Sequence, residues 1–278
     1  MKPEPIPSGA ESVKHSPARH YESDLTKILL GTSFHPGGLK LTEHLGTLLH
    51  LSSESRVLDV ASGQRASSIF LAERFRCHVV GIDYSSQNVT QPSELVVADG
   101  LASRVRFGWA DAERLPFPDA SFDAVIYERT FCTLPNKSDA AREFARVLRS
   151  GGRVGLSDFT RGQMLPQELD RLLAWIPCIA GAQSVASYVE YLRSADFDVE
   201  KVEFHDEALT KLVHQIRIKL SNAKNLIALK KLALAGVDFT SSKQMAQSVL
   251  TAIQQSQLGY AILVAIKPSS CCSTRTRL

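Results

Sequence analysis

The sequence predicts an α/β protein built on a doubly wound, mostly parallel β-sheet. Between residues 55 and 160, short apolar runs that suit strands alternate with segments whose apolar residues recur at helical spacing. Two of these runs, VLDV and HVVGID, flank the segment GQRASSIFLAERF, which has helical character and starts at Gly63, and the second run ends on an acid. Strands that alternate with helices at this pitch are typical of βαβ units, in which the strands lie parallel.

Each element can be placed in order along the chain. Residues 1–20 are rich in proline, serine and charge and are predicted to be disordered, whereas residues 21–54 carry apolar side chains at helical spacing, with a break at FHPGG. The strands expected next are VLDV, HVVGID, RVRFGWAD, DAVIYE and RVGLSDF, with helices at SSIFLAERF and AAREFARVL. Helices near 165–175 and 184–195, a strand at DVEKVEFH, a helical insertion over 207–256 and a last strand at YAILVAIKP follow, and residues 268–278 are predicted to be a mobile tail.

Composition excludes several classes of function. A chain of 278 residues that is 44% hydrophobic and 22% charged can bury one substantial core. A net charge of +3 is too small to indicate binding to nucleic acid or to an anionic membrane. No apolar run approaches the roughly 20 residues of a membrane helix, and the first residues lack the apolar core of a secretory signal. Five cysteines without regular spacing suit a reducing compartment. We therefore expect a soluble, cytoplasmic protein that acts on small molecules.

A nucleotide-like ligand is indicated by the turn after the first strand. Gly63 allows the backbone to approach a ligand closely, and Asp83 ends the second strand about 20 residues later, where a carboxylate can accept hydrogen bonds from both hydroxyls of a ribose. The G-x-G-x-x-G pattern of dinucleotide sites is absent.

The stretches WADAERLPFPDASFDAVIYE and RVLRSGGRVGLSDF resemble the class I S-adenosylmethionine-dependent methyltransferases, especially the small-molecule branch that includes quinone and sterol methyltransferases. The resemblance covers roughly residues 55–160. It implies a Rossmann-like, seven-stranded sheet, S-adenosyl-L-methionine as the cofactor and a small-molecule methyl acceptor. It also divides a domain at 21–267 into a helical cap (21–54), a cofactor-binding core (55–160) and an acceptor-side part (161–267).

The same resemblance assigns roles to individual residues. Asp59 and Gly63, with Ala61 between them, would lie under the methionine part of the cofactor, and Asp83, with Tyr84 beside it, would hold the ribose. Asp111 and Ala112 would meet the adenine, Glu128 and Arg129 would border the sulfonium, and Tyr21 would fold over the cofactor from the helical cap.

One departure from the family pattern bears on whether the cofactor can bind. The pattern after the first strand is approximately D-x-G-x-G-x-G, and here Ala61 and Arg65 replace the first and third glycines. The side chain of Arg65 could turn to solvent, pair with the carboxylate of the cofactor, or block the pocket. In the last case the protein would be a non-catalytic binding or regulatory member of the fold.

Two cysteines suggest what the acceptor is. Cys132 follows the fourth strand and Cys178 follows the fifth, which partly resembles arsenite methyltransferases, whose thiolates hold trivalent arsenic. The alternatives are plain core packing of both cysteines and an organic acceptor, a quinone or natural product methylated on carbon, oxygen or nitrogen. Cys77 is predicted to be a small, buried hydrophobic residue. Cys271 and Cys272, in the tail, either deliver a thiophilic ion or have no role.

Histidines and the helical insertion leave further alternatives open. His35 could close the site, act as a catalytic base, or be structural. His205 could contact the ligand or belong to a charged surface turn. No C-x-x-C or H-E-x-x-H spacing occurs, so no metal site is expected. The insertion at 207–256 could cap the acceptor pocket, bury a homodimer interface, or pack on the core with a solvated face.

Overall fold

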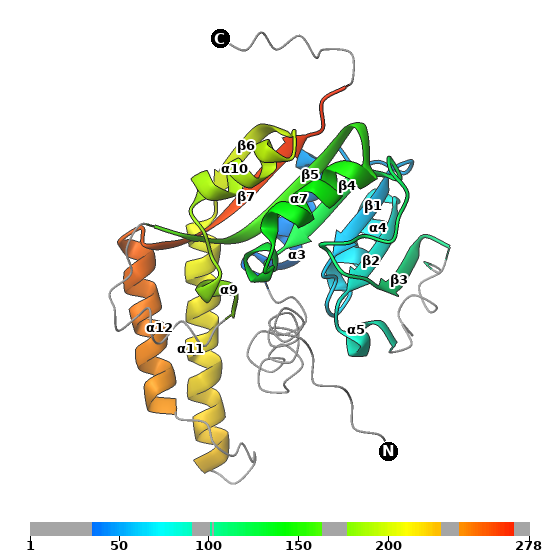
Figure 1. The fold of residues 1–278 in the computed structure, drawn as a ribbon. Helices are drawn as coiled ribbons and strands as arrows, with labels where there is room; N and C mark the ends of the chain where they lie inside the picture. Colours follow the sequence, from blue (N-terminus) through cyan, green and yellow to red (C-terminus); the bar gives the residue numbers. More distant parts are fainter. Residues whose placement is uncertain (1–34, 91–100, 102, 163–176, 229–238, 270–278) are drawn as a thin grey trace, which may run out of the picture.

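Seven strands form a single sheet in the order β3-β2-β1-β4-β5-β7-β6 in the computed structural model, which describes residues 35–90, 101, 103–162, 177–228 and 239–269 (Figure 1). The strands are β1 (Arg56–Val60), β2 (His78–Asp83), β3 (Val105–Trp109), β4 (Phe122–Glu128), β5 (Leu148–Arg161), β6 (Asp198–Phe204) and β7 (Leu258–Ile266). Strand β7 runs antiparallel to both of its neighbours, and the other pairings are parallel. This arrangement confirms the predicted Rossmann-like, mostly parallel seven-stranded sheet.

Both faces of the sheet are covered because successive residues of each strand point to opposite sides. Val57 packs in one apolar cluster with side chains of helices α3 (Gly38–Leu48) and α4 (Ala66–Phe75). The next residue, Leu58, packs in a second cluster with helices α7 (Lys137–Val147) and α10 (Val185–Ser194). Short apolar strands buried on both faces are what the sequence pattern predicts.

The insertion before the last strand forms two long helices. Helices α11 (Asp206–Ala228) and α12 (Phe239–Gln254) pack side by side and extend beyond the sheet (Figure 1). The remaining described helices are the short α5 (Ser86–Thr90), η1 (Phe131–Thr133) and α9 (Pro177–Ala180). Among the described residues, no helix combines the length and hydropathy needed to span a membrane.

Several sequence-based expectations fall outside the described residues. These are the disordered segment 1–20, Tyr21 and the first helix of the cap, the helix near 165–175, and Cys271 and Cys272. Within the described part, α3 is the cap helix that follows the FHPGG break, and α11 and α12 lie in the predicted insertion.

Candidate active site

The candidate site is a cleft at the carboxyl ends of β1, β2 and β4. The register sets Val60 beside Ile82 on one neighbour and beside Tyr127 on the other, so the residues that follow these positions converge. Ligands of open α/β sheets bind at this switch point, where chain connections leave the sheet in opposite directions. Side chains or backbone of His35, Asp59, Ala61, Gly63, Ser67, Asp83, Tyr84, Asn88, Asp111, Ala112, Glu128, Arg129 and Thr133 are among those that line the cleft.

The turn after β1 brings backbone, rather than side chains, to the cleft. Ala61 and Gly63 have φ values of 58° and 49°, in the left-handed region that favours glycine. The Ser62 amide donates to the Ile82 carbonyl at 2.9 Å, which ties the turn to β2. A Cβ added at Gly63 would come within 4 Å of one neighbouring atom alone, so the glycine leaves open space over the turn.

Asp83 is held with both carboxylate oxygens in fixed positions. One oxygen accepts from the Gly63 amide and the other from the Ser85 amide, each at 2.8 Å. Each oxygen keeps further lone-pair capacity, so a carboxylate fixed in this way can accept hydrogen bonds from two adjacent ligand hydroxyls. This geometry fits the ribose of S-adenosylmethionine.

Asp111 and Ala112, which are predicted to meet the adenine, line the cleft, and Tyr84 beside them belongs to an aromatic pair. One carboxylate oxygen of Asp111 accepts from the Glu113 amide at 3.0 Å, and Ala112 contributes buried apolar surface to the cleft. Tyr84 packs against Trp109 with ring centroids 5.6 Å apart, and the Trp109 indole donates to the Tyr84 carbonyl at 2.9 Å. The residues present therefore fit the cofactor on chemical grounds.

Arg65 does not block the cleft. Its guanidinium donates to the Asn88 carbonyl at 2.8 Å and to the Val89 carbonyl at 2.9 Å, so it caps the end of α5. The same group lies 4.6 Å from the centroid of the Phe107 ring. Arg65 is buried, and burial lowers the pKa of its guanidinium. The side chain therefore neither turns to solvent nor lines the cleft; it contacts the end of α5 and the Phe107 ring.

Asp59 is a buried acid at the floor of the cleft. Burial raises the pKa of its carboxyl to about 7, although the Ser68 hydroxyl donates to it at 2.5 Å. Glu128 and Asp83 act in the same direction through their negative charges. The cleft thus presents four acidic side chains, at Asp59, Asp83, Asp111 and Glu128; the ionised ones favour a positively charged ligand, whereas the raised pKa of Asp59 keeps a proton on that carboxyl at pH values below about 7.

Glu128 connects β4 to the two helices that cover this end of the sheet. It accepts from the Ser67 hydroxyl of α4 at 2.6 Å and from the Thr42 hydroxyl of α3 at 3.1 Å. His35 approaches both, with its Nε2 3.2 Å from Thr42 Oγ1 and 3.5 Å from Glu128 Oε2. The sequence indicates His35 and Glu128 separately but not Ser67 or Thr42, because nothing in the local pattern shows that three elements meet here.

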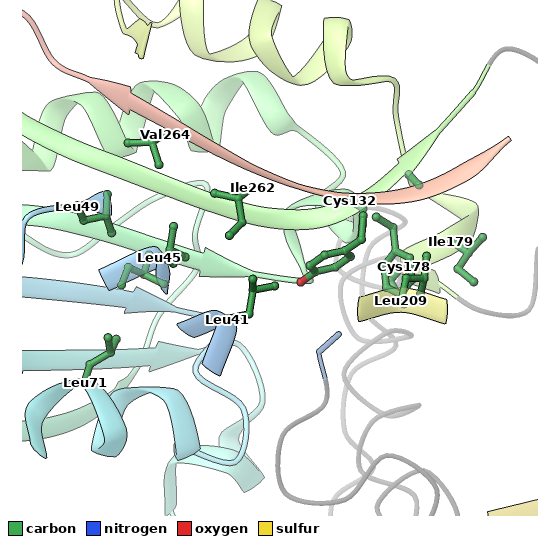
Figure 2. Close-up of a cluster of buried hydrophobic side chains, with 14 of the residues drawn as sticks. Leu41, Leu45, Leu49, Leu71, Cys132, Cys178, Ile179, Leu209, Ile262 and Val264 are labelled. Carbon is green, nitrogen blue, oxygen red and sulfur yellow. The ribbon is translucent and has the colours of Figure 1, made fainter. Parts of the chain in front are cut away.

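The structure places Cys132 and Cys178 away from the cleft lining. Both are buried within an apolar cluster, where η1 packs against α9 (Figure 2). Burial raises the pKa of the Cys132 thiol well above its usual value, and the charge of nearby Asp158 adds to the rise. The 3₁₀ turn after β4 directs the thiol inward, 3.8 Å from the Arg129 carbonyl. Neither cysteine is among the described residues that line the cleft, and their role as metalloid ligands stays a prediction.

Cys77 behaves as predicted. It is fully buried, its thiol points to the Leu71 carbonyl at 3.4 Å, and burial raises its pKa to about 11.

Comparisons with known proteins agree with this geometry. A family model described as "Methyltransferase domain" matches residues 58–156. The 27-O-demethylrifamycin SV methyltransferase of Amycolatopsis mediterranei (strain S699) is 28% identical over 232 residues, which cover 82% of this chain and 83% of that protein.

Two further comparisons concern phosphoethanolamine N-methyltransferases. Phosphoethanolamine N-methyltransferase 1 of Arabidopsis thaliana is 29% identical over 173 residues, which cover 62% of this chain. The match spans 31% of that protein's length. The structure of Haemonchus contortus phosphoethanolamine N-methyltransferase 2 in complex with S-adenosyl-L-methionine has a TM-score of 0.79 at 19% identity, covering 96% of this chain and 62% of that chain. At this identity the structural likeness shows the fold alone.

Proposed function

Because this chain is a class I S-adenosylmethionine-dependent methyltransferase that acts on a small molecule, we propose that it methylates a hydroxyl oxygen of an organic acceptor, with His35 as the general base. The observation that carries the proposal is the contact of His35 with Thr42 and Glu128 at the edge of the cleft. One relative, matched over 82% of this chain, is named 27-O-demethylrifamycin SV methyltransferase, a name that indicates methylation of an oxygen.

The hydrogen bonds around His35 suit a base. When Nε2 carries the ring proton, it donates to Thr42 Oγ1, whose own hydroxyl donates to Glu128. Nδ1 then holds the lone pair, and its 3.3 Å contact with the Pro36 carbonyl becomes a hydrogen bond only when Nδ1 takes up a proton, because a carbonyl oxygen can only accept. After a turn of the ring Nδ1 would accept the acceptor's hydroxyl proton, and the Pro36 carbonyl and Glu128 would then stabilise the imidazolium that results.

The remaining residues position the reactants. S-adenosylmethionine, when bound, supplies an electrophilic methyl group. Asp83 and Asp111 would hold the ligand's polar groups, and the carboxylate of Glu128 favours positive charge in the cleft. Alignment of the acceptor oxygen and exclusion of water supply most of the rate enhancement in such an in-line displacement. The acceptor oxygen gains the methyl group and its proton passes to His35.

The experiment is a methyl-transfer assay on the full-length protein after calorimetric titration with S-adenosylmethionine and with its demethylated product. The acceptors are 27-O-demethylrifamycin SV and simpler aromatic and alicyclic alcohols, with phosphoethanolamine and arsenite as the competing classes. We expect transfer to a hydroxyl. Absence of binding of both cofactor forms would contradict the cofactor site, and turnover of phosphoethanolamine or arsenite alone would contradict the acceptor.

Variants separate the roles. His35→Gln should lower kcat on a hydroxyl acceptor by about a hundredfold or more while leaving cofactor affinity unchanged, because a positioned base typically contributes that much. Asp83→Asn should weaken cofactor binding, and His78→Gln, at an exposed imidazole on β2, serves as the control. Full hydroxyl methylation by His35→Gln would remove His35 from the mechanism.

A metalloid acceptor is the second candidate, supported by the proximity of Cys132 and Cys178 in the fold. Cys132→Ser and Cys178→Ser should each abolish arsenite turnover if the thiols bind arsenic, whereas they should leave methylation of a hydroxyl intact.

A cytoplasmic location and a homodimer also stay predictions, and exposed Ile218 on α11 is consistent with a homodimer.

A further inference from the structure

A cluster of metal-binding side chains lies outside the cleft, where α3 meets the end of β6. His44 Nε2 is 2.6 Å from Glu203 Oε2, and His205 Nε2 is 3.3 Å from the same oxygen. The donor atoms of the three side chains all lie within 4.8 Å of one another. The two imidazole rings meet edge to face with centroids 5.9 Å apart.

Two imidazoles and one carboxylate are ligands that Zn²⁺ favours. In a tetrahedral site with bonds of about 2.0–2.2 Å, ligand atoms lie about 3.4 Å apart. The His205–Glu203 separation already matches this value, and the His44–Glu203 pair needs to open by less than about 1 Å, a movement within reach of side-chain rotation. Lys201 Nζ holds the other carboxylate oxygen, Oε1, at 2.8 Å, which orients Oε2 toward the histidines.

The exposure of the three side chains suits a site that exchanges its ion with solvent. The side chains of His44, Glu203 and His205 are 42%, 22% and 23% exposed. Three protein ligands leave a fourth position for water. None of the three residues lines the cleft.

We propose that His44, Glu203 and His205 form a binding site for a divalent transition-metal cation such as Zn²⁺, which cross-links helix α3 to strand β6. The proton shared by His44 and Glu203 leaves to solvent as the cation takes its place. Because α3 also carries Thr42, which contacts Glu128 at the cleft, the cation stabilises the helix that covers one side of the active site. The site is independent of the acceptor's identity and of the proposed role of His35.

The test is calorimetric titration of the tag-free, chelator-treated full chain with Zn²⁺ alone, combined with thermal unfolding with and without Zn²⁺. His44→Ala and His205→Ala remove one ligand each, and Glu203→Gln keeps the shape of the carboxylate. Loss of an outer-shell partner typically costs about ten- to a hundredfold in metal affinity, so loss of a ligand should cost at least about tenfold. The Zn²⁺-dependent rise in Tm should disappear in the same variants.

Matched controls are His78→Ala and His214→Ala, which remove exposed imidazoles on β2 and α11. They should retain the wild-type affinity and Tm shift. Co²⁺ gives an independent signature, because its visible absorption reports tetrahedral nitrogen and oxygen coordination in wild type and should vanish in Glu203→Gln. Equal Zn²⁺ affinity and equal Tm shifts in the ligand and control variants would overturn the proposal.

Discussion

At the scale of single residues, the turn after β1 adopts a left-handed backbone at residues other than glycine. Ala61 and Arg65 stand where the family has glycine, with φ values of 58° and 71°. A residue with a Cβ costs roughly 1–2 kcal/mol in this conformation. At Arg65 the side chain compensates through its hydrogen bonds to two carbonyls and its contact with Phe107. The Ala61 methyl group has no such bonds to offset the strain.

This difference predicts opposite outcomes for the same type of substitution. Ala61→Gly should raise the free energy of unfolding by about 1 kcal/mol, because it relieves strain and removes only a methyl group. Arg65→Gly relieves equal strain but leaves two carbonyls without their donor, so it should lower stability. Urea denaturation of both variants checks the pair. Stabilisation by Arg65→Gly would mean that its contacts contribute nothing.

Residues also mark where sequence-based inference stops. The sequence predicts a ligand role for Asp83 from its spacing and for Asp111 from the family resemblance, and the structure brings both side chains to one cleft. The direction of the Arg65 side chain could not be predicted, because it depends on where α5 ends. The thiol of Cys132 likewise turns inward through a short 3₁₀ turn that has no sequence periodicity.

At the scale of elements, order and type were predictable because the strands are short apolar runs and the helices have apolar faces. Contacts between distant elements were not. The cluster of His44 with Glu203 joins residues 159 positions apart, so no motif spacing could indicate it. The meeting of α3, α4 and β4 at Glu128 escaped sequence analysis for the same reason.

The close approach of α3 to β5 gives an element-scale prediction. A Cβ added at Gly155 would lie 2.7 Å from one side-chain carbon of Leu45 and 3.0 Å from one of Leu49. Gly155→Ala should therefore push α3 outward and lower the free energy of unfolding by about 1–3 kcal/mol. Methyl transfer should also fall, since α3 carries Thr42. Both effects are measured by denaturation and by the transfer assay.

Gly108→Ala on β3 is the matched control, because a Cβ there meets nothing within 4 Å. It should leave stability and activity near the wild-type values. If Gly155→Ala matches this control, the packing of α3 on β5 does not limit its position.

At the scale of the whole molecule, the fold buries two acidic side chains, Asp59 and Asp158, and burial makes their ionisation less favourable than it is in water. Burial raises the pKa of Asp59 to about 7 and that of Asp158 to about 6, from the model-peptide value of 3.8. Asp158 accepts from the Cys132 amide at 2.7 Å, so it anchors the turn after β4. Both groups retain a proton in the folded state at pH values where the unfolded chain has lost it.

Stability should accordingly depend on pH with a definite sign. Between the unfolded pKa of 3.8 and the folded pKa of about 7, the folded protein binds more protons at Asp59 than the unfolded chain, so the free energy of unfolding falls as pH rises. The slope from one such group is at most about 1.4 kcal/mol per pH unit. Asp59→Asn removes this titration and should make the decline shallower, leaving the part due to Asp158.

Urea denaturation of the cofactor-free protein from about pH 4 to about pH 8 measures the decline in the free energy of unfolding. A carboxyl whose pKa is raised by folding causes such a decline only between its unfolded and folded pKa values. Asp119→Asn is the control, because the Asp119 side chain is 78% exposed and the substitution removes its ion pair with Arg146 but no buried acid. The wild type and Asp119→Asn should lose stability in parallel, whereas Asp59→Asn should diverge upward as pH rises toward 7. Parallel curves for all three proteins would mean that Asp59 is ionised in the folded state throughout, and that the negative charge of the cleft is already complete before the cofactor binds.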